Sequence, residues 1–243
     1  MVLRNRIVFD YIFIFIVLYL FCIMVKSLQR IAEERSYEIL FELENEIGID
    51  TGKLPEIYYV GGPFAFGKLG IKEEIGEEYF DLVKKNKAGC CFRNHNVILL
   101  ATLKKSVLAE EVGHFIHFSN LKNKNRNLLD LYFTEMIVET LGYFSSRLIS
   151  NSRKNVYEGT KDEFEKLNFN EIFQKILDVS KEGYLNQEYL IYNQAYPMGE
   201  KLFDKYLNND LSKNQIREIF LDPLKNEEDS FYWFMRIKNN LLK

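Results

Sequence analysis

The feature that most limits the fold is an almost unbroken apolar run near the N-terminus. Ile7 to Val25 reads IVFDYIFIFIVLYLFCIMV, and Asp10 is its one charged side chain. As an α-helix, this run of nineteen residues spans about 28 Å, close to the ~30 Å hydrocarbon core of a bilayer. We therefore predict a single-pass membrane anchor over residues 1–26.

Two other interpretations of this run are a cleaved signal peptide and a buried core helix. The run continues into KSLQRIAEERS, which has no small-x-small cleavage site and keeps helical periodicity, so an uncleaved anchor is favoured. A core helix stays open because Asp10 shortens the uninterrupted apolar run to fifteen residues. Basic residues flank the run on both sides, so the positive-inside rule leaves only a weak preference for an outward-facing domain.

The composition of the whole chain suits one globular unit with an accessory segment. The chain has 243 residues, of which 47% are hydrophobic, and its 32 basic and 35 acidic residues give a formal charge of -3. Because there is no basic excess, we expect no nucleic-acid partner. Only 4 prolines and 13 glycines interrupt a chain with 15 tyrosines and 20 phenylalanines, which favours a mostly helical fold.

Hydrophobic periodicity predicts an α+β fold, mostly helical with a small sheet, in one domain over residues 27–243. Residues 27–106 would hold a helix ending at Gly48 and the sheet, with strands at Pro55–Gly62 and Asn96–Ala101. Residues 107–149 would hold two helices, and residues 150–243 a helical C-terminal part. The predicted helices after Gly48 are Lys72–Asn86, Val107–Phe118, Leu128–Ile149, Glu163–Val179, Gln187–Leu207, Asn214–Phe220 and Glu228–Leu242.

The stretch LAEEVGHFIHF, residues 108–118, concentrates titratable side chains on one predicted helix. Glu110 and His114 are four positions apart and therefore lie one turn apart on the same face, with Glu111 beside them. Two side chains in this relation can bind one cation while the carboxylate at the next position reaches a water on the metal. This is the geometry of H-E-x-x-H in zinc hydrolases, and here only the first ligand differs.

The surroundings of this helix extend the pattern. A predicted strand, Asn96–Ala101, precedes it, and a second helix with the sequence TEMIVE follows. On this helix Glu135 lies twenty-one residues after His114, and Glu139 lies four residues further on. In these features the chain resembles the gluzincin metallopeptidases, the zincin-like superfamily that includes the thermolysin type. The resemblance covers residues 56–148.

The resemblance implies a zincin-like fold and assigns roles to individual residues. It implies His114 and Glu135 as metal ligands, with Glu110 in the place of the first ligand histidine. Glu111 would be the general base that activates a metal-bound water, and Glu139 would support the ligands or act as an alternative ligand. The implied function is a membrane-anchored metal-dependent hydrolase, a peptidase acting on peptide or protein substrates.

The identity of the metal is left open by the ligand set. Zinc is the first expectation, while a carboxylate in place of an imidazole suits manganese or iron better than the usual zinc set. His117, one turn beyond His114, is an alternative ligand that would restore a second imidazole.

Three alternatives compete with the hydrolase hypothesis. The first is a catalytically inactive, zincin-like binding or scaffold protein tethered to the membrane, because the first histidine of the motif is replaced. The second is a solvated helix face that is rich in acids by coincidence. The third is a carboxylate-bridged di-iron site, which lacks the second E-x-x-H that such sites need. Tyr192 and Tyr196 could stabilise an oxyanion, but their spacing is also typical of core residues, and neither is selected as a site residue.

Overall fold

The computed structural model describes residues 2–60, 88–92, 96–120, 128–151, 171, 174, 184–221 and 230–242. Helices dominate these ranges, and three strands form a small mixed sheet, so the α+β prediction is confirmed at this level. The predicted helix Lys72–Asn86 and almost all of Glu163–Val179 lie outside the described residues. The elements are α1 (Val2–Ile47), β1 (Glu56–Tyr59), β2 (Gly89–Phe92), β3 (Val97–Leu100), α3 (Lys105–Asn120), α4 (Leu128–Ser150), α7 (Tyr184–Leu207), α8 (Lys213–Phe220) and α9 (Ser230–Leu242).

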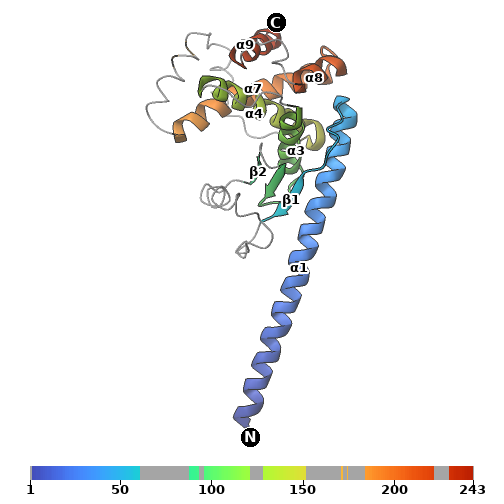
Figure 1. The fold of residues 1–243 in the computed structure, drawn as a ribbon, viewed down its shortest axis with the longest axis vertical. Helices are drawn as coiled ribbons and strands as arrows, with labels where there is room; N and C mark the ends of the chain where they lie inside the picture. The colour runs from blue at the N-terminus through green and yellow to red at the C-terminus, as the bar shows by residue number, and fades with distance from the viewer. Residues whose placement is uncertain are drawn as a thin grey trace.

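Helix α1 has two halves with different surroundings. Its N-terminal half projects away from the body of the protein, whereas its C-terminal half packs along that body (Figure 1). The side chains from Ile14 to Leu20 are exposed, and the apolar segment is long and apolar enough to cross a membrane. The helix ends where predicted, because Gly48 adopts φ 76° and its amide donates to the Glu44 carbonyl at 2.8 Å.

The C-terminal half of α1 belongs to the hydrophobic core. Apart from the neighbours Ile39 and Leu40, its buried apolar side chains recur at steps of three, four or seven residues, as expected for a helix with one covered face. That face packs against β1, α3 and α8. The apolar N-terminal segment is therefore joined to the folded body by one continuous helix. The buried residues are Ala32, Ile39, Leu40, Leu43 and Ile47.

The sheet has the order β1-β3-β2, with β1 parallel and β2 antiparallel to β3. All four residues of β3 are fully buried. Because buried backbone groups need hydrogen-bond partners, β3 requires a strand on each side. This requirement explains β2, whose sequence GCCF gave no strand signal. One row of the sheet pairs Tyr59 with Leu100 and Leu100 with Gly89.

Helices α3 and α4 approach each other closely at two glycines. A Cβ atom added at Gly113 would lie 2.4 Å from the hydroxyl oxygen of Ser145, and one added at Gly142 would lie 2.2 Å from Cε1 of His114. Glycine inside a helix costs about 1 kcal/mol relative to alanine. Here the absence of a side chain lets the two helices, and the ring of His114, pack together.

Helix α4 packs its other side against α7, where a buried ion pair joins them. The Nε atom of Arg147 donates to Oε2 of Glu200 at 2.8 Å, and the hydroxyl of Tyr143 donates to the same oxygen at 3.0 Å. The Arg147 guanidinium also lies 4.6 Å from the centre of the Phe203 ring. These contacts fix α7 on α4 and place its tyrosines next to the α3–α4 interface.

Candidate metal centre

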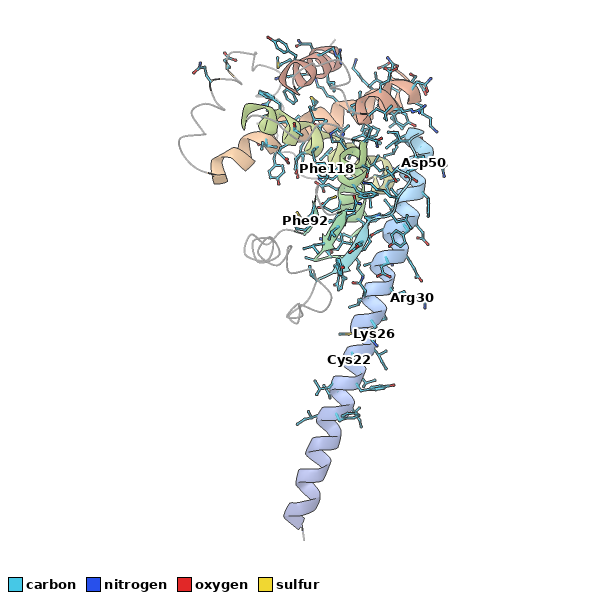
Figure 2. All side chains as sticks on the ribbon, viewed as in Figure 1. Cys22, Lys26, Arg30, Asp50, Phe92 and Phe118 are labelled. Carbon is cyan, nitrogen blue, oxygen red and sulfur yellow. The ribbon has the colours of Figure 1, made fainter. Side chains whose placement is uncertain are left out.

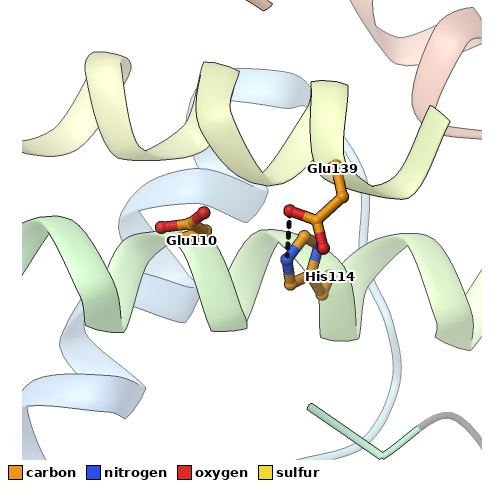
Figure 3. Close-up of side chains that lie close together, drawn as sticks. All are labelled: Glu110, His114 and Glu139. Carbon is orange, nitrogen blue, oxygen red and sulfur yellow. Dashed lines mark ion pairs between the residues drawn. The ribbon is translucent and has the colours of Figure 1, made fainter. Parts of the chain in front are cut away.

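Three side chains from two helices converge at the α3–α4 interface. Glu110 and His114 come from α3 and Glu139 comes from α4, and one ligand atom of each lies within 4.8 Å of those of the other two. The Nε2 atom of His114 is 3.9 Å from Oε2 of Glu139 (Figure 3). Glu110 and His114 share one face of α3 because they are separated by four residues, as the sequence predicted. These three residues are named the EHE cluster below.

The EHE cluster is largely shielded from solvent. Glu110 is 5% exposed and His114 is 6% exposed, while the Glu139 side chain is 18% exposed. The imidazole of His114 lies directly over Gly142, where any Cβ atom would overlap it. The ring position is therefore set by the close contact between α3 and α4.

The donor set and its spacing fit a divalent cation. Two ligands of a tetrahedral ion at ~2.1 Å lie about 3.4 Å apart, and the 3.9 Å between His114 and Glu139 exceeds this by roughly half an ångström. Side-chain rotations alone can close such a gap. One imidazole nitrogen and two carboxylate oxygens suit zinc, manganese and iron.

A cavity of about 370 Å³ opens onto the EHE cluster. Four elements form its walls: β2, α3, α4 and α7. Each of the four glutamates that the sequence singled out reaches it. The lining residues are Ala88, Gly89, Cys90, Cys91, Val107, Glu110, Glu111, His114, Phe118, Glu135, Val138, Glu139, Tyr192 and Tyr196.

The charges around this cavity are strongly one-sided. Among the lining residues that the structure describes, four are glutamates, one is a histidine, and none is lysine or arginine. Keeping several carboxylates together in a partly dehydrated space is expensive unless a cation compensates them. A cation bound at the EHE cluster would compensate part of this charge.

Glu111 lies beside the EHE cluster and against the sheet. It is 7% exposed, and a Cβ atom added at Gly89 would lie 2.8 Å from its Cγ and Oε1 atoms. The missing side chain at Gly89 thus makes room for the Glu111 carboxylate between α3 and β2. Glu111 is outside the three converging ligands and lines the same cavity, which is where a general base would be needed.

Tyr196 connects α7 to the EHE cluster. Its hydroxyl donates to Oε1 of Glu110 at 3.4 Å, and its ring lies 5.1 Å from that of Tyr143 and from that of Tyr192, centre to centre. Burial, followed by the charges of Glu110 and Glu139, raises the pKa of Tyr196 well above its ordinary value of 10. The hydroxyl is therefore a neutral hydrogen-bond donor across the physiological pH range.

The cysteines of β2 are poor candidates for chemistry at this site. Burial, followed by the charge of Glu111, raises the pKa of the Cys91 thiol well above 9.0. The thiolate, which is the nucleophilic and metal-binding form, is thus disfavoured.

The predicted site residues occupy different places in the structure. Glu110, His114 and Glu139 come together, with one ligand atom of each within 4.8 Å of those of the other two. Glu135 lines the cavity, but its role as a ligand stays a prediction. His117 lies elsewhere: it is 1% exposed and its Nδ1 atom is 3.2 Å from the Phe220 carbonyl oxygen at the end of α8.

Three residues that shape the site have little or no signal in the sequence. Tyr196 has a weak one, because tyrosines four residues apart are usually core residues. Gly142 and Gly89 are outside the predicted site, although both make room for a site residue. A glycine inside a predicted helix is a usable signal, since its cost suggests a packing or functional reason.

Comparison of the chain with protein-family models, with curated proteins and with solved structures finds no match. A function must therefore be inferred from the geometry and chemistry of the site.

Proposed function

We propose that the protein is a membrane-anchored, metal-dependent hydrolase of zincin-like type that cleaves peptide bonds. The observation that carries the proposal is the convergence of Glu110, His114 and Glu139 within 4.8 Å of one another, beside Glu111. A divalent cation held there would lower the pKa of a water molecule and polarise a carbonyl group. Zinc is the first expectation, with manganese and iron as alternatives.

Glu111 is assigned the role of general base. Its carboxylate lines the cavity and is not one of the three converging ligands, and in this role it would accept a proton from the attacking water. The proton would reside on a carboxylate oxygen of Glu111 and pass from there to the departing amine. Gly89 keeps this carboxylate in place by leaving space for it.

Tyr196 is assigned a supporting role for the developing negative charge. Its neutral hydroxyl points into the EHE cluster and is 3.4 Å from Glu110. A donor at this distance is weakly bound and can turn towards a substrate oxygen that becomes negative during attack.

A peptide is favoured as substrate because β2 forms one wall of the cavity. Of the strands that the structure describes, β2 is at the edge of the sheet and contributes Gly89, Cys90 and Cys91 to the lining. An edge strand offers backbone amides and carbonyls to an extended peptide. The cavity thus combines a cation site with a surface that suits an extended chain.

The test is hydrolysis of a fluorogenic peptide library by the full-length protein, loaded with zinc or manganese. Glu111→Gln should lower the rate by about 10²- to 10⁴-fold and retain the metal. His114→Ala should lose both the activity and the metal. Glu38→Gln, at an exposed acid of α1, is the matched control and should behave as wild type. Wild-type activity in both site variants would refute the assignment.

The alternative is a zincin-like scaffold that has lost its metal, and Glu110→His separates it from an active enzyme. If the native protein binds metal, the scaffold hypothesis fails. If only Glu110→His binds zinc and hydrolyses peptides, the site is a decayed enzyme and the native protein is a binding module.

A further inference from the structure

The inference begins with the contact between α1 and the sheet. The side chain of Gln29 donates to the Ile57 carbonyl at 2.7 Å and accepts from the Tyr59 amide at 2.8 Å. Its amide group thus replaces a neighbouring strand along the outer edge of β1. Gln29 lies four residues after Val25, the last residue of the apolar run, or about 6 Å along the helix.

A second contact fixes the direction of the sheet relative to α1. The hydroxyl of Tyr37 donates to the carbonyl of Pro55 at 3.3 Å, eight residues beyond Gln29 on α1. The two positions on α1 are about 12 Å apart, and Pro55 and Tyr59 are about 13 Å apart on an extended strand. Strand β1 therefore runs along α1 in the opposite direction, with its C-terminal end towards the apolar segment.

The catalytic side of the cavity lies at this same end of the sheet. Tyr59 pairs with Leu100 and Leu100 pairs with Gly89, so the row that begins at Gln29 ends at Gly89. Gly89 is the residue against which Glu111 packs. Of the residues labelled in Figure 2, Phe92 of β2 lies between Arg30 and Asp50 along α1, and Phe118, which lines the cavity, lies near the level of Asp50 at the far end of the helix.

We propose that α1 holds the cavity with its Gly89 rim on the membrane side of the folded body, and that the substrate is an extended peptide segment of another membrane-embedded protein, next to the bilayer. This rests on the proposed hydrolase function and on α1 spanning the membrane. The headgroup layer is roughly 5–7 Å thick on each side of the hydrocarbon core. The sheet row that leads to Glu111 starts about 6 Å beyond that core, measured along α1.

The chemistry of the cavity favours a peptide over a lipid. The backbone of β2 can pair with an extended chain, which needs no charge complementarity. A juxtamembrane segment enters at this level because its own anchor holds it there.

The position of the site can be measured without relying on hydrolysis. In the full-length chain with its three cysteines replaced by alanine, a nitroxide is attached at Ala88→Cys, on the exposed rim of the cavity. A matched nitroxide is attached at Leu207→Cys. Leu207 is 65% exposed and adjoins Tyr206, whose hydroxyl contacts Glu46 near the far end of α1.

Both labelled proteins are placed in nanodiscs with nickel-chelating lipid headgroups. Relaxation of the Ala88 label should be at least about tenfold stronger than that of the Leu207 label, because Glu46 is about 30 Å from Val25 along α1. Equal relaxation at the two positions would overturn the proposed placement, whether or not the protein is an enzyme.

The substrate class is tested with a single-span reporter whose tail contains repeated copies of one octapeptide. The full-length protein, loaded with zinc or manganese in the same nanodisc, should cut the repeat nearest the bilayer about tenfold faster than the soluble octapeptide at the same bulk concentration. Inserting fourteen helix-forming residues after Lys26 raises the site by about 21 Å. Cleavage should then move outward to a more distant repeat.

The outcomes separate the two proposals. Equal cleavage of soluble and tethered peptide, or an unchanged cut position after the insertion, would refute the juxtamembrane substrate and leave the hydrolase intact. Hydrolysis of lipid esters instead of the peptide would refute the substrate class. If no peptide is cut in any format, the hydrolase proposal fails, while the nitroxide measurement still decides the position of the site.

Discussion

Helix α4 carries parts of two buried polar clusters, eight residues apart, that differ in how their charges are balanced. Arg147 pairs with Glu200 at 2.8 Å and Tyr143 donates to the same carboxylate, so a cation of the protein itself neutralises the acid. At the other cluster Glu139 faces His114 and Glu110, in a cavity whose described lining has four acids and one imidazole.

The difference between the clusters suggests different purposes. The Arg147–Glu200 pair is complete within the chain and joins α4 to α7, as a structural contact does. The EHE cluster brings two carboxylates and one imidazole together in an arrangement that could hold a divalent cation. Changes at the Arg147–Glu200 pair should therefore lower the stability and leave metal binding intact. Changes at the EHE cluster should instead abolish metal binding.

The largest effect on stability is expected at the balanced pair. Arg147→Met leaves the carboxylate of Glu200 buried without its cation, and the free energy of unfolding should fall by about 3–5 kcal/mol. Urea unfolding of the metal-free protein measures this. Arg147→Met with Glu200→Leu should recover most of the loss. A change below about 1 kcal/mol in the single variant would show that the pair is not a structural contact.

The second effect is the stabilisation of the folded protein by a bound cation. At a zinc or manganese concentration about one hundred times the dissociation constant, the free energy of unfolding should rise by about 2.7 kcal/mol. Glu139→Gln should abolish this rise, because it removes a charged ligand, whereas Arg147→Met should keep it. Thermal unfolding with and without metal is the measurement. Loss of the metal effect in Arg147→Met alone would reverse the roles of the clusters.

In the metal-free protein, a smaller change of opposite sign in the free energy of unfolding is expected at the EHE cluster. At pH 8, Glu139→Gln removes one of several neighbouring negative charges and should stabilise the protein by about 1 kcal/mol. Glu200→Gln should instead destabilise it, since Arg147 then loses its partner. Urea titrations of the two variants, run side by side, provide the comparison. Destabilisation by both changes would mean that the EHE cluster is balanced from within.

The last effect is a pH dependence of the stability that arises outside both clusters. Lys238 of α9 is 1% exposed and donates to Gln194 at 3.2 Å, and burial lowers its pKa from 10.5 to about 8. The folded state therefore binds fewer protons than the unfolded state between pH 8 and 10.5, so its contribution to stability rises with pH in that window. Below pH 8 the full cost of burying the protonated Lys238 amine lowers the stability.

Lys238→Met removes this contribution. Relative to wild type, the variant should gain about 1–2 kcal/mol below pH 8, after allowance for solvent screening, and the gain should shrink as the pH approaches 10.5. Chemical unfolding of the two proteins at several pH values tests this. A difference that does not change with pH would contradict it.

The sequence predicted the parts of the fold that depend on local patterns. The end of α1 at Gly48 follows from a glycine that can adopt a positive φ, and β3 follows from its run of four apolar residues. Strand β2 was missed because GCCF neither alternates nor is rich in β-branched residues. It is a strand because β3 needs a second hydrogen-bonding neighbour, which is a tertiary requirement.

The candidate site shows the same division. The spacing of Glu110 and His114 on one helix was enough to place them together. The choice between Glu135 and Glu139 was not determined by sequence, since both lie on the same face of α4 and both reach the cavity. The position of α4 along α3 determines which glutamate lies next to His114. That position depends on close contacts at Gly113 and Gly142.

The central claim is that the EHE cluster holds a divalent cation. The most direct test is elemental analysis of the full-length protein, purified without chelators and dialysed against zinc and manganese, next to His114→Ala. The expected result is about one metal ion per wild-type chain and less than about a tenth of that in the variant. No bound metal in the wild type, or equal metal in both proteins, would contradict it.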